Sequence, residues 1–365
     1  MSLRIVKPGL LSSVQDRGRR GHAALGVGHA GAIDLPSLAI ANALVGNTAG
    51  AAALEMTVVG AVCRFERATR IALCGAEIDA RLDARTIGGW QAIDVQAGQT
   101  LDCTRFVHGA RACLAVRGGF AVARALGSAS ADLNAGIGPR ALAAGDRLDF
   151  GDATTGGASD GFGEVERGHS SDHRGIRSGR AGDPREVQGG RASDTWEVQG
   201  GRASDRRHIP FLVDSRRWFD ADVEVPLRLM RGRHHDALDA ASRRALFGAP
   251  FRVARDSNRV GLRLEGPVLH LAQPLELVSE AVTDGSLQLP PGGQPIMLMA
   301  EHPTTGGYPR IGQLAAADLA RLGQRRPGDP VRFVECSLDE AIAAERRQRI
   351  ELDLLLTAIR ERVHR

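Results

Sequence analysis

Short apolar segments separated by turn residues run through most of the chain. Residues 55–66, 70–81 and 111–120 are rich in Val, Ile, Leu and Cys and are bounded by Gly or Asp, which predicts β-strands. The stretches "AIDVQAGQTLDC" and "ALAAGDRLDFG" each have the form strand, Ala-Gly turn, strand. Because turn signals recur about every ten residues, the pattern favours a barrel or a sandwich.

The C-terminal half shows the same pattern. Strands and turns are predicted in "PLRLMRG", "FRVARDSNRVGLRLEG", "LELVSEAVTDGSLQLPPGGQPIMLMAE" and "GDPVRFVEC". One helix is expected between Asp34 and Gly46-Asn47, another in "HHDALDAASRRALFG", and a charged amphipathic helix over 338–363. We therefore predict a mainly β fold with two β-barrel-like units and few helices.

A segment of different composition separates the two halves. From 151 to 207, Gly, Ser, Asp and Arg dominate, and "EVQGGRASD" occurs twice. Such a segment buries too little apolar surface to offset the entropy lost on ordering, which predicts a disordered linker. The expected organisation is an N-terminal β unit at 1–150, a linker at 151–207, a C-terminal β unit at 208–336 and a helical segment at 337–365.

Composition and charge argue against several classes of function. The chain has 365 residues and a formal charge of +4, but its arginines and carboxylates are interspersed and only 4% of its residues are aromatic. This distribution argues against a nucleic-acid-binding surface. No apolar run reaches the roughly 18 residues of a membrane span, and no signal peptide is evident, so a cytoplasmic protein is expected. The cysteines lack C-x-x-C spacing and are expected to be reduced core residues.

The single lysine and the histidine spacing exclude further chemistries. Lys7 is the only lysine and is not preceded by the glycines of a phosphate loop, so the chain has no G-x-x-x-x-G-K-[ST] motif. Because Lys7 lies beside Pro8 near the start of the sequence, it is not expected to carry covalent biotin. His234 and His235 are adjacent and would diverge on a helix. His169 and His173 have the spacing H-x-x-x-H, but they lie in the polar segment where no helix is predicted, so we expect no metal site from histidine spacing. The pattern G-x-S-x-G occurs only as "GASDG" at 157–161, inside the polar segment and not between a strand and a helix, so it does not indicate a nucleophile.

The stretch "GVGHAG" at 26–31 has the form G-x-G-x-x-G, which is typical of dinucleotide-binding loops. The residues before it, "SSVQDRGRRGHAAL", are too polar for the buried parallel strand that such a loop requires, so we expect no NAD or flavin there. A glycine-rich loop before a helix N-terminus still suits a polar or anionic ligand, with Gly31 in the loop and Asp34 at the helix start. Asp34 is equally suited to a purely capping role.

Two further stretches carry candidate binding groups. "EHPTTGGYPRIG" follows an apolar strand and offers hydroxyl and backbone donors for a carboxylate, carbonyl or phosphate oxygen. "RDSNRVGLRLEGP" offers the amide of Asn258 and the guanidinium of Arg259, which is suited to binding a carboxylate. Each stretch is also consistent with a simple turn. The candidates in the first stretch are Thr304, Thr305, Gly306, Gly307 and Tyr308.

Three long motifs identify a resemblance. "GLLSSVQDRGRRGHAALGVGHAGAIDLPSLAIANALVGN", "SNRVGLRLEGP" and "TDGSLQLPPGGQPIMLMAEHPTTGGYPRIGQLAAADLARLGQRRPGDPVRF" resemble the biotin-dependent carboxyltransferase-like family. That family includes the C-type subunit of bacterial 5-oxoprolinase, proteins labelled allophanate hydrolase subunit 2, the carboxyltransferase region of urea amidolyase and KipA-type sensor-kinase antagonists. The resemblance implies two all-β units, with at least the C-terminal one cyclophilin-like.

The resemblance also implies a function. It suggests the C-type subunit of an ATP-dependent 5-oxoprolinase complex, a hydrolase that opens the lactam of 5-oxoproline to glutamate together with B-type (KipI-like) and A-type lactam-utilisation subunits. ATP is implied as a co-substrate of the complex by resemblance alone. Two alternatives stay open: a biotin-dependent carboxyltransferase subunit of a urea amidolyase-like system, and a non-catalytic regulator that binds a kinase inhibitor.

Candidate roles follow from the motifs and the resemblance together. Asp34 would cap the helix and polarise a ligand or a water molecule. Asn258 and Arg259 would hold the substrate carboxylate. Backbone groups would come close to the substrate at Gly31, Gly306 and Gly307. Thr304, Thr305 and Tyr308 would contact the reacting carbonyl or phosphate.

The chain departs from the family pattern in three places, one of which is a shortened loop near "AGIGPRALAAGD". The family commonly has Pro and Ser in the loop that here reads Gly28-His29-Ala30, so no role for that serine hydroxyl carries over. The residues before Thr304 commonly resemble D-R-Q, whereas this chain has Glu301-His302-Pro303. These changes bear on the identity of the substrate rather than on the fold.

Overall fold

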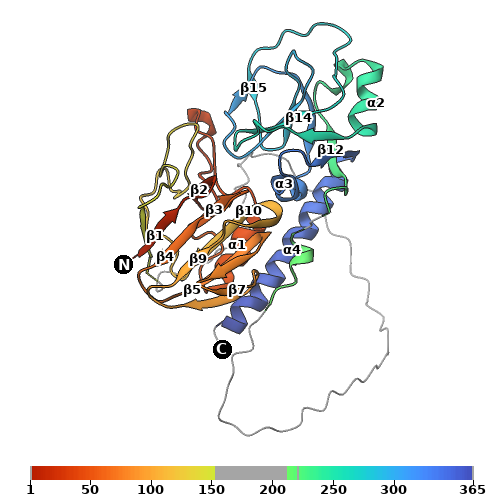
Figure 1. Ribbon diagram of the computed structural model, residues 1–365. Helices are drawn as coiled ribbons and strands as arrows, with labels where there is room; N and C mark the ends of the chain where they lie inside the picture. Colours follow the sequence, from red (N-terminus) through yellow and green to blue (C-terminus); the bar gives the residue numbers. More distant parts are fainter. Residues whose placement is uncertain (1, 153–211, 220–221, 364–365) are drawn as a thin grey trace, which may run out of the picture. The chain divides into compact units, whose positions relative to one another are not determined.

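Two antiparallel sheets form the N-terminal part of the computed structural model, which describes residues 2–152, 212–219 and 222–363 (Figure 1). One sheet has the strand order β11-β1-β4-β9-β6-β7, and the other has the order β2-β3-β10-β5-β8. The strands are β1 (Ser2–Lys7), β2 (Leu11–Gln15), β3 (Ala53–Thr57), β4 (Val62–Phe65), β5 (Thr69–Ile78), β6 (Ala80–Leu82), β7 (Arg85–Ile87), β8 (Ala92–Val95), β9 (Thr100–Asp102), β10 (Phe106–Val116) and β11 (Arg147–Asp149).

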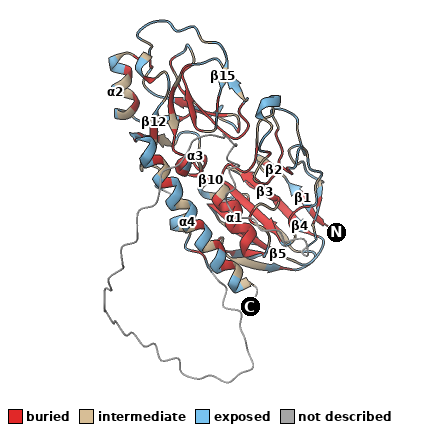
Figure 2. Cartoon of the chain, turned by 180° about the vertical axis from the view of Figure 1, so that it is seen from behind, coloured by how far each residue is buried: buried red, intermediate tan, exposed pale blue. Residues whose placement is uncertain are grey.

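Both sheets contribute to one hydrophobic core. Leu3 and Ile5 of β1 point into it, whereas Arg4 between them is exposed, as expected for a strand whose side chains alternate between faces. Leu54 and Met56 of β3 reach the same core from the other sheet. Figure 2 shows the central strands of this part as largely buried. Side chains that alternate between the two faces of each strand therefore supply the apolar contacts that hold the two sheets together.

Helix α1 (Leu35–Leu44) packs against β5 and β10, which belong to the second sheet. Every residue from Pro36 to Leu44 is buried, so the helix has no solvent face. The side chain of Asp34 accepts a hydrogen bond from the backbone nitrogen of Ser37 and caps the helix. Gly46 follows the C-terminus with φ of 82°, a left-handed conformation that glycine adopts without strain.

A third sheet, of eight strands, nearly closes on itself. Its order is β20-β13-β14-β17-β16-β19-β12-β21, and its edge strands β20 and β21 are separated in sequence only by Arg332, so the two edges meet. The strands are β12 (Leu227–Arg231), β13 (Phe251–Val253), β14 (Gly261–Glu265), β16 (Ser286–Gln288), β17 (Ile296–Leu298), β19 (Arg310–Leu314), β20 (Pro330–Val331) and β21 (Phe333–Glu335). A separate pair joins β15 (Glu280–Ala281) to β18 (Thr305–Gly306).

The remaining helices are short except for the last. They are α2 (Ala240–Gly248), α3 (Leu319–Gly323) and α4 (Leu338–Val363), with 3-10 turns at Ala23–Leu25, Ser215–Arg217, His235–Ala237 and Ala316–Asp318. Within the described residues, no helix combines the length and apolar character that a membrane span requires.

The structure confirms the prediction of a mainly β fold, and the third sheet has the nearly closed form expected of a barrel. The interpretation of "ALAAGDRLDFG" as two strands is wrong, because only β11 forms there. In "AIDVQAGQTLDC" both strands form, but they do not pair with each other. Strand β8 pairs with β5, whereas β9 pairs with β4 and β6, so this connection passes from one sheet to the other. Of the predicted linker, residues 153–207 lie outside the described part of the chain.

Helix α4 occupies the range predicted from its amphipathic pattern and packs against α1. Ile359 is fully buried, whereas Ile350 on the same helix is 59% exposed. We expect Ile359→Val to lower the free energy of unfolding by about 0.5–1.5 kcal/mol, because the deleted methylene leaves a small cavity. The matched control Ile350→Val should stay within about 0.5 kcal/mol of wild type in urea denaturation. Equal effects at the two positions would contradict this packing.

Candidate functional site

Three stretches singled out in the sequence meet in the folded chain. Arg259 donates from Nη2 to the carbonyl oxygen of Gly31 at 2.6 Å, which joins the third stretch to the "GVGHAG" loop. The backbone nitrogen of Glu301 donates to the carbonyl oxygen of Arg259 at 2.9 Å. A Cβ at Gly28 would lie 3.1 Å from the carbonyl oxygen of His302, so the loop packs closely against the residues before Thr304. The two glycine-rich segments therefore belong to one site.

The "GVGHAG" loop does not follow a strand of the type found in dinucleotide-binding folds. Strand β2 is antiparallel to β3 and is separated from the loop by a 3-10 turn. Gly18 fits against the loop, since a Cβ there would lie 2.4 Å from the carbonyl oxygen of His29. The expectation that no NAD or flavin binds stays a prediction.

Arg259 is enclosed by groups of this chain. Its Nε donates to Glu301 Oε1 at 2.5 Å, its Nη1 contacts Glu55 Oε1, and the residue is only 3% exposed. A guanidinium bound in this way has little room for a substrate carboxylate. Its contacts therefore correct the expected role: Arg259 positions the loop and the two glutamates, and is not placed to bind substrate directly.

The two glutamates have backbone partners as well. Glu55 Oε2 accepts from the nitrogen of Ile33 at 2.8 Å, and Glu301 Oε2 accepts from the nitrogen of Leu133 at 3.1 Å. Both carboxylates are nearly fully buried. A buried charge is tolerated only when it is paired and hydrogen-bonded, and this network meets both conditions. Sequence reasoning missed the network, because its members lie far apart along the chain.

Asp34 caps the N-terminus of α1, which is one of the two roles that the sequence allowed for it. It accepts hydrogen bonds from Ser37 and, at 2.6 Å, from Nε2 of Gln324, and it is 1% exposed. Burial raises the pKa of Asp34, although the hydrogen bonds from Ser37 and Gln324 act in the opposite direction. With both oxygens enclosed, the carboxylate is not placed to polarise a ligand or a bulk water molecule.

Asn258 forms a turn. Its Oδ1 accepts hydrogen bonds from the backbone nitrogens of Val260 at 2.9 Å and Gly261 at 3.2 Å. This is the local turn that the sequence left as an alternative. The side-chain oxygen is thus occupied, and we assign Asn258 a structural role beside Arg259.

The loop that carries Thr304, Thr305 and Tyr308 is open to solvent. Thr305 is exposed and Tyr308 is 46% exposed. Their hydroxyls, and that of Thr304, form no hydrogen bond with the described residues. The loop is anchored by the β15–β18 pair and by a bond from the nitrogen of Val282 to the carbonyl oxygen of Thr304 at 3.1 Å. These hydroxyls are therefore available to a ligand.

Gln288 adds a group that sequence reasoning missed. It is 6% exposed, its Nε2 has no hydrogen-bond partner among the described residues, and a Cβ at Gly306 would lie 2.4 Å from that nitrogen. The backbone of Gly306 therefore lies close to the Gln288 amide. Gly307 is exposed beside it. An unpaired buried amide next to the open loop is a further donor for the site.

A cluster of two histidines and an aspartate was also missed. His29 lies in the "GVGHAG" loop, His302 precedes Thr304, and both contact Asp284. The hydrogen bond with Asp284 raises the pKa of His29, against the effect of burial. Burial by itself would raise the pKa of Asp284, but the contacts with His29 and His302 outweigh it and lower that pKa. No spacing in the sequence brings these residues together.

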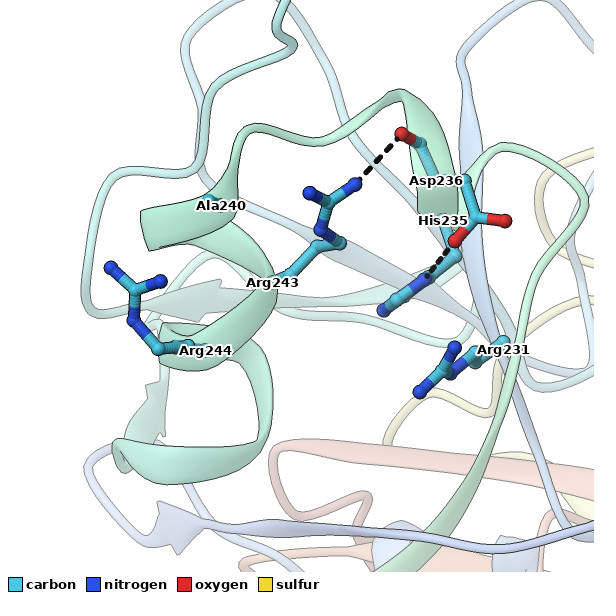
Figure 3. Close-up of a pocket in the computed structure, with 6 residues that line it drawn as sticks. All are labelled: Arg231, His235, Asp236, Ala240, Arg243 and Arg244. Atoms are coloured by element: carbon cyan, nitrogen blue, oxygen red, sulfur yellow. Dashed lines mark hydrogen bonds and ion pairs between the residues drawn. The ribbon is translucent and has the colours of Figure 1, made fainter.

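Two surface cavities lie outside this set. One, of about 450 Å³, is bounded by α2, by the last residue of β12 and by the 3-10 turn that follows β12, and Figure 3 shows Arg231, Arg243 and Arg244 around it. Two of them are already engaged, since Arg231 pairs with Glu335 at 2.6 Å and Arg243 donates to the carbonyl oxygen of Asp236 at 3.1 Å. The other, of about 540 Å³, adjoins Arg70 and Asp94. Neither cavity is lined by a predicted site residue.

The cysteines are all reduced and buried, as expected from their spacing. Burial raises the pKa of Cys63 to about 12. Burial also raises the pKa values of Cys74, Cys103 and Cys113 well above the ordinary value. Thiols that do not ionise are poor nucleophiles, so these residues serve packing.

Comparison with known families decides the assignment. The pattern described as "Carboxyltransferase domain, subdomain A and B" matches residues 25–335. The chain belongs to this carboxyltransferase domain family. It is 36% identical over 350 residues to the C-type subunit of 5-oxoprolinase from Escherichia coli, and the match covers 95% of each chain.

Solved structures of the family extend the comparison. The crystal structure of TTHA0988 is 33% identical with a TM-score of 0.67, and the match covers 91% of this chain and 55% of that one. The Kluyveromyces lactis urea amidolyase structure is 25% identical with a TM-score of 0.76, and the match covers 97% of this chain and 20% of that one. The carboxyltransferase domain described here thus spans about half of the first protein and a fifth of the second.

Proposed function

We propose that this protein is the C-type subunit of an ATP-dependent 5-oxoprolinase complex. The observation that carries the proposal is the end-to-end correspondence with the E. coli protein, since that relative has nearly the same extent as this chain. Matches to urea amidolyase cover only a portion of a much longer protein. The identity to the E. coli subunit is 36%, against 25% to the Saccharomyces cerevisiae urea amidolyase, and this difference favours a role in a hydrolase complex.

The open loop supplies the groups that lactam hydrolysis requires. Thr304, Thr305 and Tyr308 present hydroxyls that have no partner among the described residues. Transfer of the phosphoryl group and attack of water develop negative charge on the phosphoryl oxygens and on the oxygens of the reacting carbon, and fixed donors aimed at these oxygens stabilise the transition states. The Gln288 amide beside Gly306 is a candidate for the same task.

The remaining machinery belongs to partner chains. ATP is a co-substrate of the complex in this proposal, and the chain itself carries no phosphate loop. The partners are B-type (KipI-like) and A-type lactam-utilisation subunits, and the complex is cytoplasmic. In the proposed sequence, ATP phosphorylates the lactam oxygen and leaves as ADP. Water then adds to the activated carbon, the C–N bond breaks as the nitrogen takes up a proton, and glutamyl phosphate forms. A second water molecule attacks its carbonyl carbon and releases glutamate and phosphate. This carboxyltransferase domain is expected to be inactive alone.

The test is reconstitution. We expect the full chain, co-expressed with A-type and B-type subunits, to release glutamate from 5-oxoproline only when ATP is added. Omission of this chain should abolish turnover. A complete complex that binds ATP but leaves 5-oxoproline intact would contradict the proposal.

A second candidate is a biotin-dependent carboxyltransferase, favoured by the fold shared with urea amidolyase. It predicts carboxyl transfer from a separate biotinyl domain, measured as transfer of labelled bicarbonate to urea in the presence of a biotin carboxylase. The regulator alternative predicts neither reaction, but binding to a kinase inhibitor. The two assays together with a binding measurement separate all three functions.

A further inference from the structure

The residues His29, Asp284 and His302, here called the His–Asp–His cluster, bring three ligand atoms within 4.8 Å of one another. His29 Nε2 lies 2.5 Å from Asp284 Oδ2, and His302 Nε2 lies 3.2 Å from Asp284 Oδ1. The imidazole rings are nearly perpendicular, at 89°, with centroids 6.1 Å apart. Two edge-on imidazoles thus converge on one carboxylate.

Backbone geometry sets this convergence. Strands β15 and β18 pair in a register that places Ala281 opposite Thr305. The hydrogen bond from the nitrogen of Val282 to the carbonyl oxygen of Thr304 continues this pairing by one residue toward Asp284 and His302. His29 is brought in from the N-terminal part because Gly28 allows its loop to approach the carbonyl oxygen of His302. Three segments far apart in the sequence therefore present one group each.

The tautomers are fixed by hydrogen bonds to carbonyl oxygens. His29 Nδ1 contacts the carbonyl oxygen of Ala30 at 2.8 Å, and His302 Nδ1 contacts that of Pro303 at 2.6 Å. A carbonyl oxygen only accepts, so each Nδ1 carries the proton. The other nitrogen of each ring, Nε2, faces Asp284. Metal-binding histidines are commonly oriented by the same contact of one ring nitrogen with a carbonyl oxygen.

The cluster leaves an acceptor without a donor. Asp284 Oδ1 is buried and has no hydrogen-bond partner among the described residues, although His302 Nε2 is near it. The approach thus lacks the alignment of an N–H···O bond, as expected when both atoms point to a common third position. Two imidazole nitrogens and a carboxylate oxygen facing one another require a cation between them or protons on the rings.

We propose that the His–Asp–His cluster binds a divalent transition-metal ion of the zinc class. Two imidazoles and one carboxylate are the ligand set of Zn²⁺ sites that keep an open position. His302 is 6% exposed, whereas the side chains of His29 and Asp284 are 32% and 26% exposed, so one side of the cluster is accessible to a further ligand. Thr304 and Thr305 follow on the same segment. An oxygen-bearing ligand bound to the ion would therefore reach the open loop.

The test is metal binding by the full chain, purified without a histidine tag and stripped with a chelator. We expect Zn²⁺ to bind with one ion per chain in calorimetry, and Co²⁺ to give visible absorption bands of a low-coordinate site. His29→Ala and Asp284→Asn should each weaken binding by at least about tenfold, because each removes a ligand. These readouts do not depend on the proposed function.

His108→Ala is the matched control, because His108 also contacts a carboxylate, Glu77, at 2.8 Å, but both side chains are 58% exposed and no third ligand joins them among the described residues. It should bind like wild type. Wild-type protein that takes up no Zn²⁺ would overturn the proposal. Binding that survives His29→Ala unchanged would overturn it too. His29 is partly exposed, so this variant decides the matter even where a His302 variant fails to fold.

Discussion

Arg259→Met is expected to lower the free energy of unfolding by about 3–5 kcal/mol. The substitution keeps the apolar stem but leaves Glu55 and Glu301 buried without their cation. Removing one partner of a buried ion pair is strongly destabilising, since the remaining charges stay out of water. Urea denaturation followed by tryptophan fluorescence measures the change.

Arg263→Met is the matched control. Arg263 lies on the adjoining strand β14 and pairs with Asp256 at 2.9 Å, but both side chains are more than half exposed. Exposed pairs contribute about 0–1 kcal/mol, so this variant should stay close to wild type. A similar loss in both variants would show that burial of the Arg259 network has been overestimated.

A triple variant separates charge from packing. Adding Glu55→Gln and Glu301→Gln to Arg259→Met removes the two uncompensated charges. Part of the lost stability should return, because neutral amides are less costly to bury than carboxylates. If the triple variant is less stable than the single one, the hydrogen bonds to backbone nitrogens outweigh the charges.

The local elements could be predicted from the sequence because their causes are local. Asp34, Pro36 and the following apolar residues define α1, and the spacing of Leu352, Leu356 and Ile359 defines α4. Strands such as β1 show their alternation in the sequence itself. The long motifs identified the family, so the mainly β fold followed from both arguments.

The pairing between distant residues could not be predicted. Arg259 is a residue type that often binds a substrate carboxylate, but its environment depends on Glu55, which lies 204 residues earlier. Strands β8 and β9 were expected to pair for the same reason, since their short connection resembles a hairpin turn. Their partners are distant in sequence, and each strand belongs to a different sheet. A sequence states which groups are present, whereas tertiary contacts decide which of them face a ligand.

The loop at 304–308 is the exception, because its features are local. Two hydroxyl residues followed by two glycines predict an open turn with free donors, and the structure places Thr305 and Tyr308 in solvent. The Gln288 amide beside them has no signal in the sequence beyond an alternating strand. The accessible part of the candidate site was therefore predictable, and its buried support was not.

Thr305→Ala and Tyr308→Phe are expected to lower kcat of the reconstituted complex with little change in KM. A donor that stabilises the developing oxyanion acts in the transition state rather than in substrate binding, and its loss typically costs about 10²–10³ in rate. Both hydroxyls are exposed and take no part in the described hydrogen bonds, so the fold and the complex should be unaffected. Steady-state glutamate release with ATP and 5-oxoproline measures the effect, and size-exclusion chromatography checks assembly.

Two variants make this prediction specific to the hydroxyl groups of the loop. Thr305→Ser keeps the hydroxyl oxygen and should retain most of the activity that Thr305→Ala loses. If the methyl group of Thr305 mattered instead, both variants would lose activity, because both lack that methyl group. Thr86→Ala removes another exposed threonine, on β7 of the N-terminal sheets, and should turn over like wild type. Wild-type rates in both Thr305→Ala and Tyr308→Phe would remove the loop from the reaction, even in a complex that hydrolyses the lactam. A wild-type complex that never hydrolyses the lactam would instead contradict the assignment of 5-oxoproline as the substrate. The same variants would then be compared in the carboxyl-transfer assay, because negative charge also develops on a carbonyl oxygen in that reaction.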